Sequence, residues 1–135
     1  MKNNHLLIFS GLLFATLLAS PHAAASNWPS WRGPNGNGTS PEKNLPAKWS
    51  TTENVAWKID LPGAAGATPA IWENKIFVTS ASGNELVLLC ISTDGKVLWK
   101  KPLAGGNKKI RNDEGNSAAP SPATDGKHVW TFLGT

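Results

Sequence analysis

The feature that most constrains the fold is an internal repeat of short β-rich segments. Val55–Lys58 reads Val-Ala-Trp-Lys, and Val97–Lys100 reads Val-Leu-Trp-Lys 42 residues later. Thr68-Pro69-Ala70 returns as Ser121-Pro122-Ala123 at an offset of 53 residues. The larger second offset indicates an insertion within residues 105–119. Two matches in the same order, each in a β-rich segment, indicate a repeated structural unit rather than chance.

Turn residues divide the chain after Thr52 into short strands, because Asx-Gly pairs between β-rich runs are hairpin signals. The predicted strands are Val55–Leu61, Thr68–Trp72, Lys75–Ser80, Glu85–Ser92, Lys96–Leu103, Pro120–Thr124 and Lys127–Leu133. No stretch after residue 25 has the 3.6-residue apolar period of a helix, so the predicted class is all-β. A period near 42 residues with four strands per unit is typical of a β-propeller blade.

The N-terminus carries the three parts of a secretory signal peptide. Lys2 is positively charged, Leu6–Ala19 is apolar and uncharged, and Ala23 and Ala25 are the small residues that precede a cleavage site. A membrane-spanning helix needs about 20 apolar residues, and this run ends before Pro21. We therefore expect a signal peptide over residues 1–25 and a periplasmic or secreted protein with no membrane span after cleavage.

The cysteine, histidine and charge content excludes several kinds of site. Cys90 is the single cysteine and lies in an apolar run, where a buried, inert thiol is expected. His128 is the one histidine after residue 25, which excludes zinc sites built from several Cys and His and haem attachment through CxxCH. The formal net charge of +4 is too small and scattered to indicate nucleic-acid binding.

Residues 26–52 are rich in Pro, Gly, Asn and Trp and are predicted to form an irregular arm. Asn35–Gly38 should turn, because Asn and Gly tolerate positive φ. The indole rings of Trp28, Trp31 and Trp49 are expected to pack on the β-rich domain of residues 53–135. Rings on a free tail would expose a large apolar area.

The unit Thr68–Leu103 resembles the repeat of quinoprotein-type propellers, which are named for pyrroloquinoline quinone (PQQ). Its marks are a strand that opens with a small residue and Pro, a hairpin, and the sequence DGKVLWK at Asp94–Lys100. The segments around it, NWPSWRGPNGNGTSP from Asn27 and SAAPSPATDGKHVWTFLGT from Ser117, resemble an exported bacterial subgroup of PQQ-binding-like repeat proteins.

This resemblance implies a β-propeller of four-stranded antiparallel blades. Residues 1–135 would hold about one and a half of them: a blade over 68–103, an insertion over 105–119 and an incomplete blade over 120–135. Val55–Leu61 would be an orphan strand that closes the ring with the last blade. Trp57 and Trp99 would wedge between neighbouring blades. Because a ring needs at least four blades, the chain is expected to be an N-terminal fragment.

The resemblance is compatible with several functions, because proteins of one fold have many different activities. The expected function is a scaffold that binds a protein or small-molecule ligand in the cell envelope. The alternative is part of a PQQ-dependent dehydrogenase, and a weaker alternative is a carbohydrate-binding module that uses exposed tryptophans. No cofactor is evident in the residues, and PQQ with calcium is implied by the resemblance alone.

One candidate ligand patch lies in the insertion and consists of Asn112, Asp113, Glu114 and Asn116. Calcium takes several oxygen ligands, and an insertion before an innermost strand should lie at one mouth of the channel. The other interpretation is a solvated loop, because the adjacent Asp113 and Glu114 need not face one site. His128 is expected to be a packed or edge histidine on a strand, since no nucleophile-elbow sequence accompanies it. No catalytic or metal-binding residue is assigned.

Overall fold

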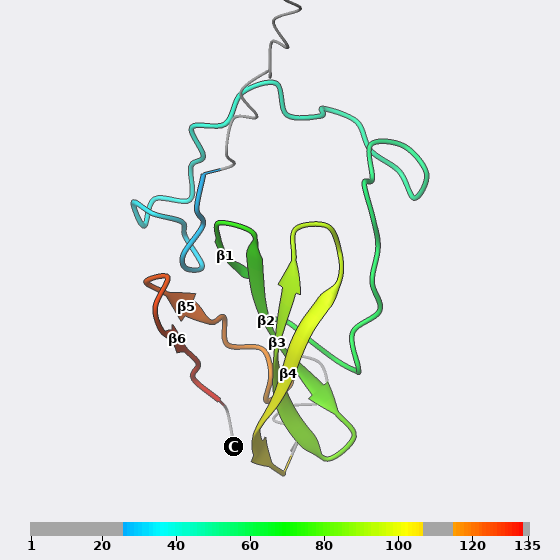
Figure 1. The fold of residues 1–135 in the computed structure, drawn as a ribbon, viewed down its shortest axis with the longest axis vertical. Coiled ribbons are helices and arrows are strands. Elements are labelled where there is room, and N and C mark those ends of the chain that lie inside the picture. The colour runs from blue at the N-terminus through cyan, green and yellow to red at the C-terminus, as the bar shows by residue number, and fades with distance from the viewer. Residues whose placement is uncertain (1–25, 107–114, 134–135) are drawn as a thin grey trace, which may run out of the picture.

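The computed structural model describes residues 26–106 and 115–133, which form an all-β fold without a helix. Four consecutive strands make one antiparallel sheet in the order β1-β2-β3-β4, and two further strands make a separate antiparallel pair. The strands are β1 (Ala70–Trp72), β2 (Lys75–Ser82), β3 (Glu85–Ser92), β4 (Val97–Gly105), β5 (Ala123–Thr124) and β6 (Val129–Trp130). The β5–β6 pair lies beside the four-stranded sheet, with β5 against β1 (Figure 1). No described residue belongs to a helix that could cross a membrane.

The predicted strands of the repeat unit are confirmed, and they pair with one another in chain order. β3 has the predicted bounds, and β2 extends two residues further, to Ser82. β4 begins one residue later than predicted, at Val97, and ends two residues later, at Gly105. The turns that separate them use the expected residues, with Gly83 at φ +59° and Gly95 at φ +86°. β1, β5 and β6 are shorter than predicted, because β1 pairs three residues with β2 and β6 pairs two with β5.

The predicted strand Val55–Leu61 is wrong for the described residues, where this segment has no strand assignment; its role as the orphan that closes the ring with the last blade stays a prediction. Extended chain becomes a strand only where a neighbouring backbone completes a hydrogen-bond ladder, and the described residues place no strand beside this segment. Its alternate side chains Trp57, Ile59 and Leu61 pack instead on one face of the four-stranded sheet. The segment therefore covers the sheet rather than extending it.

Both faces of β2 and β3 are buried, so these strands show no alternation of apolar and polar residues. Successive side chains of a strand point to opposite faces. Leu88 contributes to a cluster with Ala70, Phe77 and Cys90, whereas its neighbour Leu89 contributes to a cluster with Val78, Val87 and Ile91. We call these two faces the Leu88 face and the Leu89 face. The sheet is thus the middle layer of three.

Different parts of the chain cover the two faces. On the Leu88 face, Val129 of β6 packs on the cluster together with Trp72 and Trp99. On the Leu89 face, the covering residues come from the segment before β1, which includes Trp57. The middle of the sheet is therefore enclosed by chain that precedes it and chain that follows it.

Two adjacent hydroxyl groups at the centre of β2 hold these covering segments. Thr79 Oγ1 donates a hydrogen bond of 2.8 Å to the carbonyl oxygen of Ala118, and Ser80 Oγ donates one of 3.1 Å to that of Gly63. Both side chains are fully buried. A buried hydroxyl without a partner costs about 1–3 kcal/mol, so these bonds fix where each segment crosses the sheet.

The arm is irregular, as predicted, and only its beginning lies against the domain. Trp28 forms one antiparallel bridge with Ile71, with N–H···O distances of 2.9 and 2.8 Å in the two directions. Trp31 and Trp49 are 66% and 74% exposed, so the expectation that they pack on the domain is wrong. The physical reason is that the backbone of the arm bonds to the sheets at Trp28 and Pro29, on β1 and β5, and beyond these residues the chain loops away from the sheet (Figure 1).

Candidate functional site

Most of the predicted ligand patch lies outside the described residues, namely Asn112, Asp113 and Glu114. The remaining member, Asn116, forms a local turn: its Oδ1 accepts the backbone N–H of Ala118 at 2.8 Å. Its own carbonyl oxygen accepts the N–H of Ala119 at 3.0 Å. The amide oxygen of Asn116 therefore helps to position Ala118, whose carbonyl oxygen accepts the hydrogen bond from Thr79.

The start of β1 and the residues before β5 meet beside this turn. The backbone N–H of Thr68 donates to Ser121 Oγ at 2.9 Å, and these two residues occupy equivalent positions in the sequence repeat. Close packing continues at Gly66, where an added Cβ would lie 3.2 Å from the Cβ of Ala119. Equivalent parts of successive repeats are therefore direct neighbours in space.

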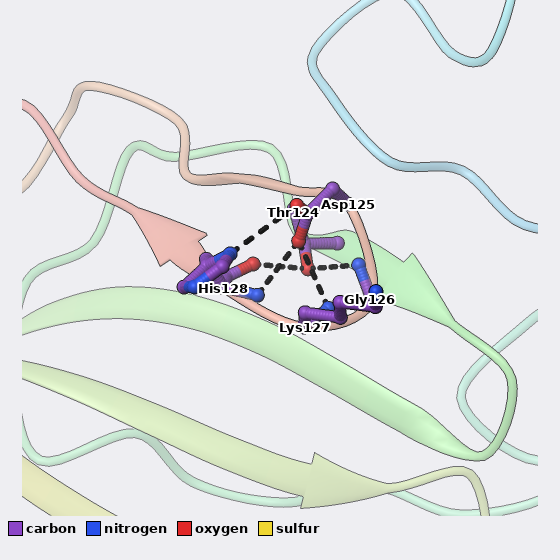
Figure 2. Close-up of polar contacts among 5 residues, drawn as sticks. All are labelled: Thr124, Asp125, Gly126, Lys127 and His128. Carbon is purple, nitrogen blue, oxygen red and sulfur yellow. Dashed lines mark hydrogen bonds and ion pairs between the residues drawn. The ribbon is translucent and has the colours of Figure 1, made fainter.

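The turn between β5 and β6 carries a cluster of polar contacts (Figure 2). Asp125 Oδ1 accepts the backbone N–H groups of Lys127 at 2.9 Å and His128 at 2.7 Å. Thr124 Oγ1 donates to the carbonyl oxygen of His128 at 2.6 Å and accepts the N–H of Gly126 at 3.0 Å. Side chains of Asp and Thr commonly close turns in this way.

His128 lies in this turn and not on a strand, so that part of the expectation is wrong. The Asp125 carboxylate accepts the N–H of His128 and so keeps this residue in the turn. The hydrogen-bond ladder with β5 begins at the next residue, Val129. Its Nδ1 is 3.3 Å from Asp125 Oδ2, and its ring contacts Trp130 with centroids 5.7 Å apart. Such a pair orients an imidazole, but a general base also needs a nucleophile within hydrogen-bond reach. The side-chain partner that the structure gives His128 is Asp125.

The pKa of Asp125 is lowered from 3.8 to about 2, chiefly because its carboxylate accepts the backbone N–H of His128. The N–H of Lys127 and the imidazole of His128 lower it further. A carboxyl group whose pKa is depressed by folding stabilises the fold above its unfolded pKa and loses that contribution as the pH falls through its folded pKa.

We therefore expect the free energy of unfolding to decrease between about pH 4 and about pH 2, and to decrease less in the Asp125→Ala variant. Urea titrations at several pH values in this window measure the effect. Asp60→Ala, at an exposed aspartate outside the turn, is the matched control and should follow the wild-type profile. Identical profiles for wild type and Asp125→Ala would contradict the role of this carboxylate.

A second kind of contact in this region was not anticipated from the sequence. The sequence Thr-Asp-Gly-Lys occurs at Thr93–Lys96 and again at Thr124–Lys127. In both turns the glycine lies under an indole ring: Trp57 covers Gly95 and Trp72 covers Gly126. Trp57 Nε1 also donates to the carbonyl oxygen of Thr93 at 2.7 Å. The signal that could have revealed these contacts is the recurrence of a turn sequence whose glycine leaves room for a ring.

Cys90 is fully buried in the Leu88 face, as expected. Loss of hydration raises the pKa of its thiol, and Lys75 opposes this effect. A buried thiol with a raised pKa holds little thiolate, which is the reactive form. Cys90 therefore acts as a small apolar side chain.

The described residues thus offer a clamped turn at Asp125–His128, the Asn116 turn and the contact between Thr68 and Ser121. Among residues 26–106 and 115–133, no group of three or more His, Cys, Asp or Glu side chains could hold a metal ion. Comparison of the chain with protein-family models, curated proteins and solved structures finds no match.

Proposed function

We propose that this chain contributes a blade and the first hairpin of a second blade to an exported β-propeller of the quinoprotein type, and that this propeller is a binding scaffold in the cell envelope. The observation that carries the proposal is the burial of both faces of β2 and β3 by segments from neighbouring repeats. Blades of a propeller are packed in this way around the axis. A sheet at the surface of a sandwich would have one exposed face.

Two contacts between repeats support the same arrangement. Thr68 and Ser121 are equivalent residues and are joined by a hydrogen bond, which fits innermost strands that follow one another around an axis. Trp57 docks on the turn at Gly95 from the segment before the blade, as a residue of a preceding blade would. A ring needs at least four blades, so the proposed propeller includes blades beyond these residues.

The scaffold function requires only surfaces that the fold presents at its turns and edges. A PQQ-dependent dehydrogenase would need oxygen ligands for calcium, and Asp113 and Glu114 are the residues that the insertion offers for that role. Sugar binding is favoured by one observation, the exposure of the indole rings of Trp31 and Trp49. Aromatic rings of this kind combine an apolar face with a polar edge.

The scaffold proposal predicts a discrete complex and no oxidation chemistry. In native electrophoresis of the envelope fraction, the protein should migrate as one species larger than the free chain. In a dye-linked assay with alcohols or sugars, added PQQ and calcium should leave the rate at background. Migration as a free chain would contradict the scaffold. Turnover that Asp113→Asn or Glu114→Gln abolishes would favour the dehydrogenase, and saturable glycan binding lost in Trp49→Ala would favour the sugar-binding module.

A further inference from the structure

Four consecutive residues at the start of the arm each bond to a different part of the chain. The backbone nitrogen of Ser26 lies 2.8 Å from Glu42 Oε1, and Ser26 Oγ donates to the same oxygen at 2.6 Å. Asn27 Oδ1 accepts the backbone N–H of Glu73 at 2.6 Å. We call Ser26–Pro29 the N-terminal hook.

The other half of the hook joins the two sheets. Trp28 exchanges two backbone hydrogen bonds with Ile71 of β1, and the carbonyl oxygen of Pro29 accepts the N–H of Thr124 of β5 at 2.9 Å. The ring of Trp28 lies against Gly33, where an added Cβ would be 2.8 Å from the nearest ring atom. The hook is therefore a connection between β1 and β5, anchored at its first residue by Glu42.

The expected cleavage site directly precedes this hook. Hydrolysis of the peptide bond between Ala25 and Ser26 consumes one water molecule, leaves a carboxylate on Ala25 and leaves an amino group on Ser26. An α-amino group has a pKa of about 7.7–8.0, so at neutral pH most of it is protonated and charged. The atom that contacts Glu42 as a neutral N–H would then contact it as an ammonium group.

This change of charge strengthens an existing contact. Hydrogen bonds in which donor and acceptor are both ionised are shorter and stronger than neutral ones. The carboxyl group of Glu42 is already suited to this role, because the hydroxyl and the backbone N–H of Ser26 lower its pKa and keep it ionised. The pair joins the two ends of the loop between residues 26 and 42. The other three residues of the hook directly follow Ser26 in the chain.

We propose that removal of the signal peptide after Ala25 creates an anchoring group: the new α-ammonium of Ser26 pairs with Glu42 and holds the N-terminal hook across β1 and β5. The inference depends on the expected export and cleavage and is separate from the binding function. The hydrogen bonds of the hook are already made in the chain that still includes residues 1–25, so cleavage adds charge to an existing contact.

The test uses the processed protein purified from the envelope. Its mass should correspond to a chain that begins at Ser26. The pKa of the Ser26 α-amino group, followed by NMR, should be higher than in the Glu42→Gln variant, because the neutral amide no longer stabilises the ammonium. Amide exchange at Trp28 and Ile71 should be about two- to fivefold faster in Glu42→Gln, the range typical of an exposed ion pair.

Two controls separate the ion pair from a general effect of substitution. Acetylation of the α-amino group of the processed protein near pH 6.5, where lysines remain protonated, should reproduce the faster exchange. Glu53→Gln, at an exposed glutamate directly after the arm, should leave the pKa of the Ser26 α-amino group and the exchange unchanged. A different N-terminal residue would overturn the proposal, and so would an α-amino pKa that Glu42→Gln does not alter. Neither outcome depends on whether the protein enters a complex.

Discussion

Replacing either Leu88 or Leu89 by alanine should lower the free energy of unfolding by about 2–5 kcal/mol, the usual range for a buried leucine. The two side chains are neighbours in β3 but belong to opposite faces, and they are 6% and 3% exposed. Each substitution removes apolar contacts and leaves a cavity. Since small domains are stable by about 5–15 kcal/mol, either substitution should remove a large share of the total stability.

Urea denaturation followed by tryptophan fluorescence measures both changes. The control is Leu98→Ala on β4, where the side chain is 49% exposed and the loss should be below about 1 kcal/mol. The diagnostic result is a similar loss of unfolding free energy in Leu88→Ala and Leu89→Ala. If one of them behaved like Leu98, one face of the sheet would be open to water, and the three-layer arrangement that carries the proposed propeller would be wrong.

The second large effect is expected at Gly95, where alanine should cost about 2–4 kcal/mol. Two causes add together. The residue has φ +86°, which L-residues adopt at a cost of about 1–2 kcal/mol, and an added Cβ would lie 2.7 Å from the ring of Trp57. Gly83→Ala is the matched control, since Gly83 has φ +59° and open space around it, and it should show only the backbone cost.

A double-mutant cycle with Trp57→Ala isolates the contact between the ring and the turn. In that background the penalty of Gly95→Ala should fall to that of Gly83→Ala, because no ring remains for the new methyl group to meet. Both penalties come from thermal or urea unfolding of the four proteins. An undiminished penalty in the Trp57→Ala background would show that Trp57 does not dock on this turn.

Local sequence signals predicted the central strands well. The run from Glu85 to Ser92 is β-rich and is bounded by Gly83-Asn84 and Asp94-Gly95, so its bounds follow from turn chemistry alone. Val55–Leu61 also contains β-branched and aromatic residues, yet it forms no ladder, because a strand also requires a partner edge. Composition likewise could not separate Trp28, which meets the edge of β1, from the exposed Trp31 and Trp49.

The candidate site was harder to predict for the same reason. The spacing Asp125-x-x-His128 is a local signal for a side chain that accepts the N–H groups two and three residues ahead, and it could have placed His128 in a turn. The N-terminal hook has no such signal. Asn27 and Glu73 are 46 residues apart, so their contact arises from the tertiary fold and not from any pattern near either residue.

The enclosure of β2 and β3 from both sides also bears on the order in which the chain acquires its structure. The hairpin of β2 and β3 needs only the turn at Gly83-Asn84 to close, so its loop is short and its formation is fast. A chain that is made from its N-terminus delivers Trp57 before this hairpin and Ala118 and Val129 after it. During synthesis the Leu88 face therefore lacks its cover until the later residues emerge. In that interval it is an apolar surface that a chaperone would recognise.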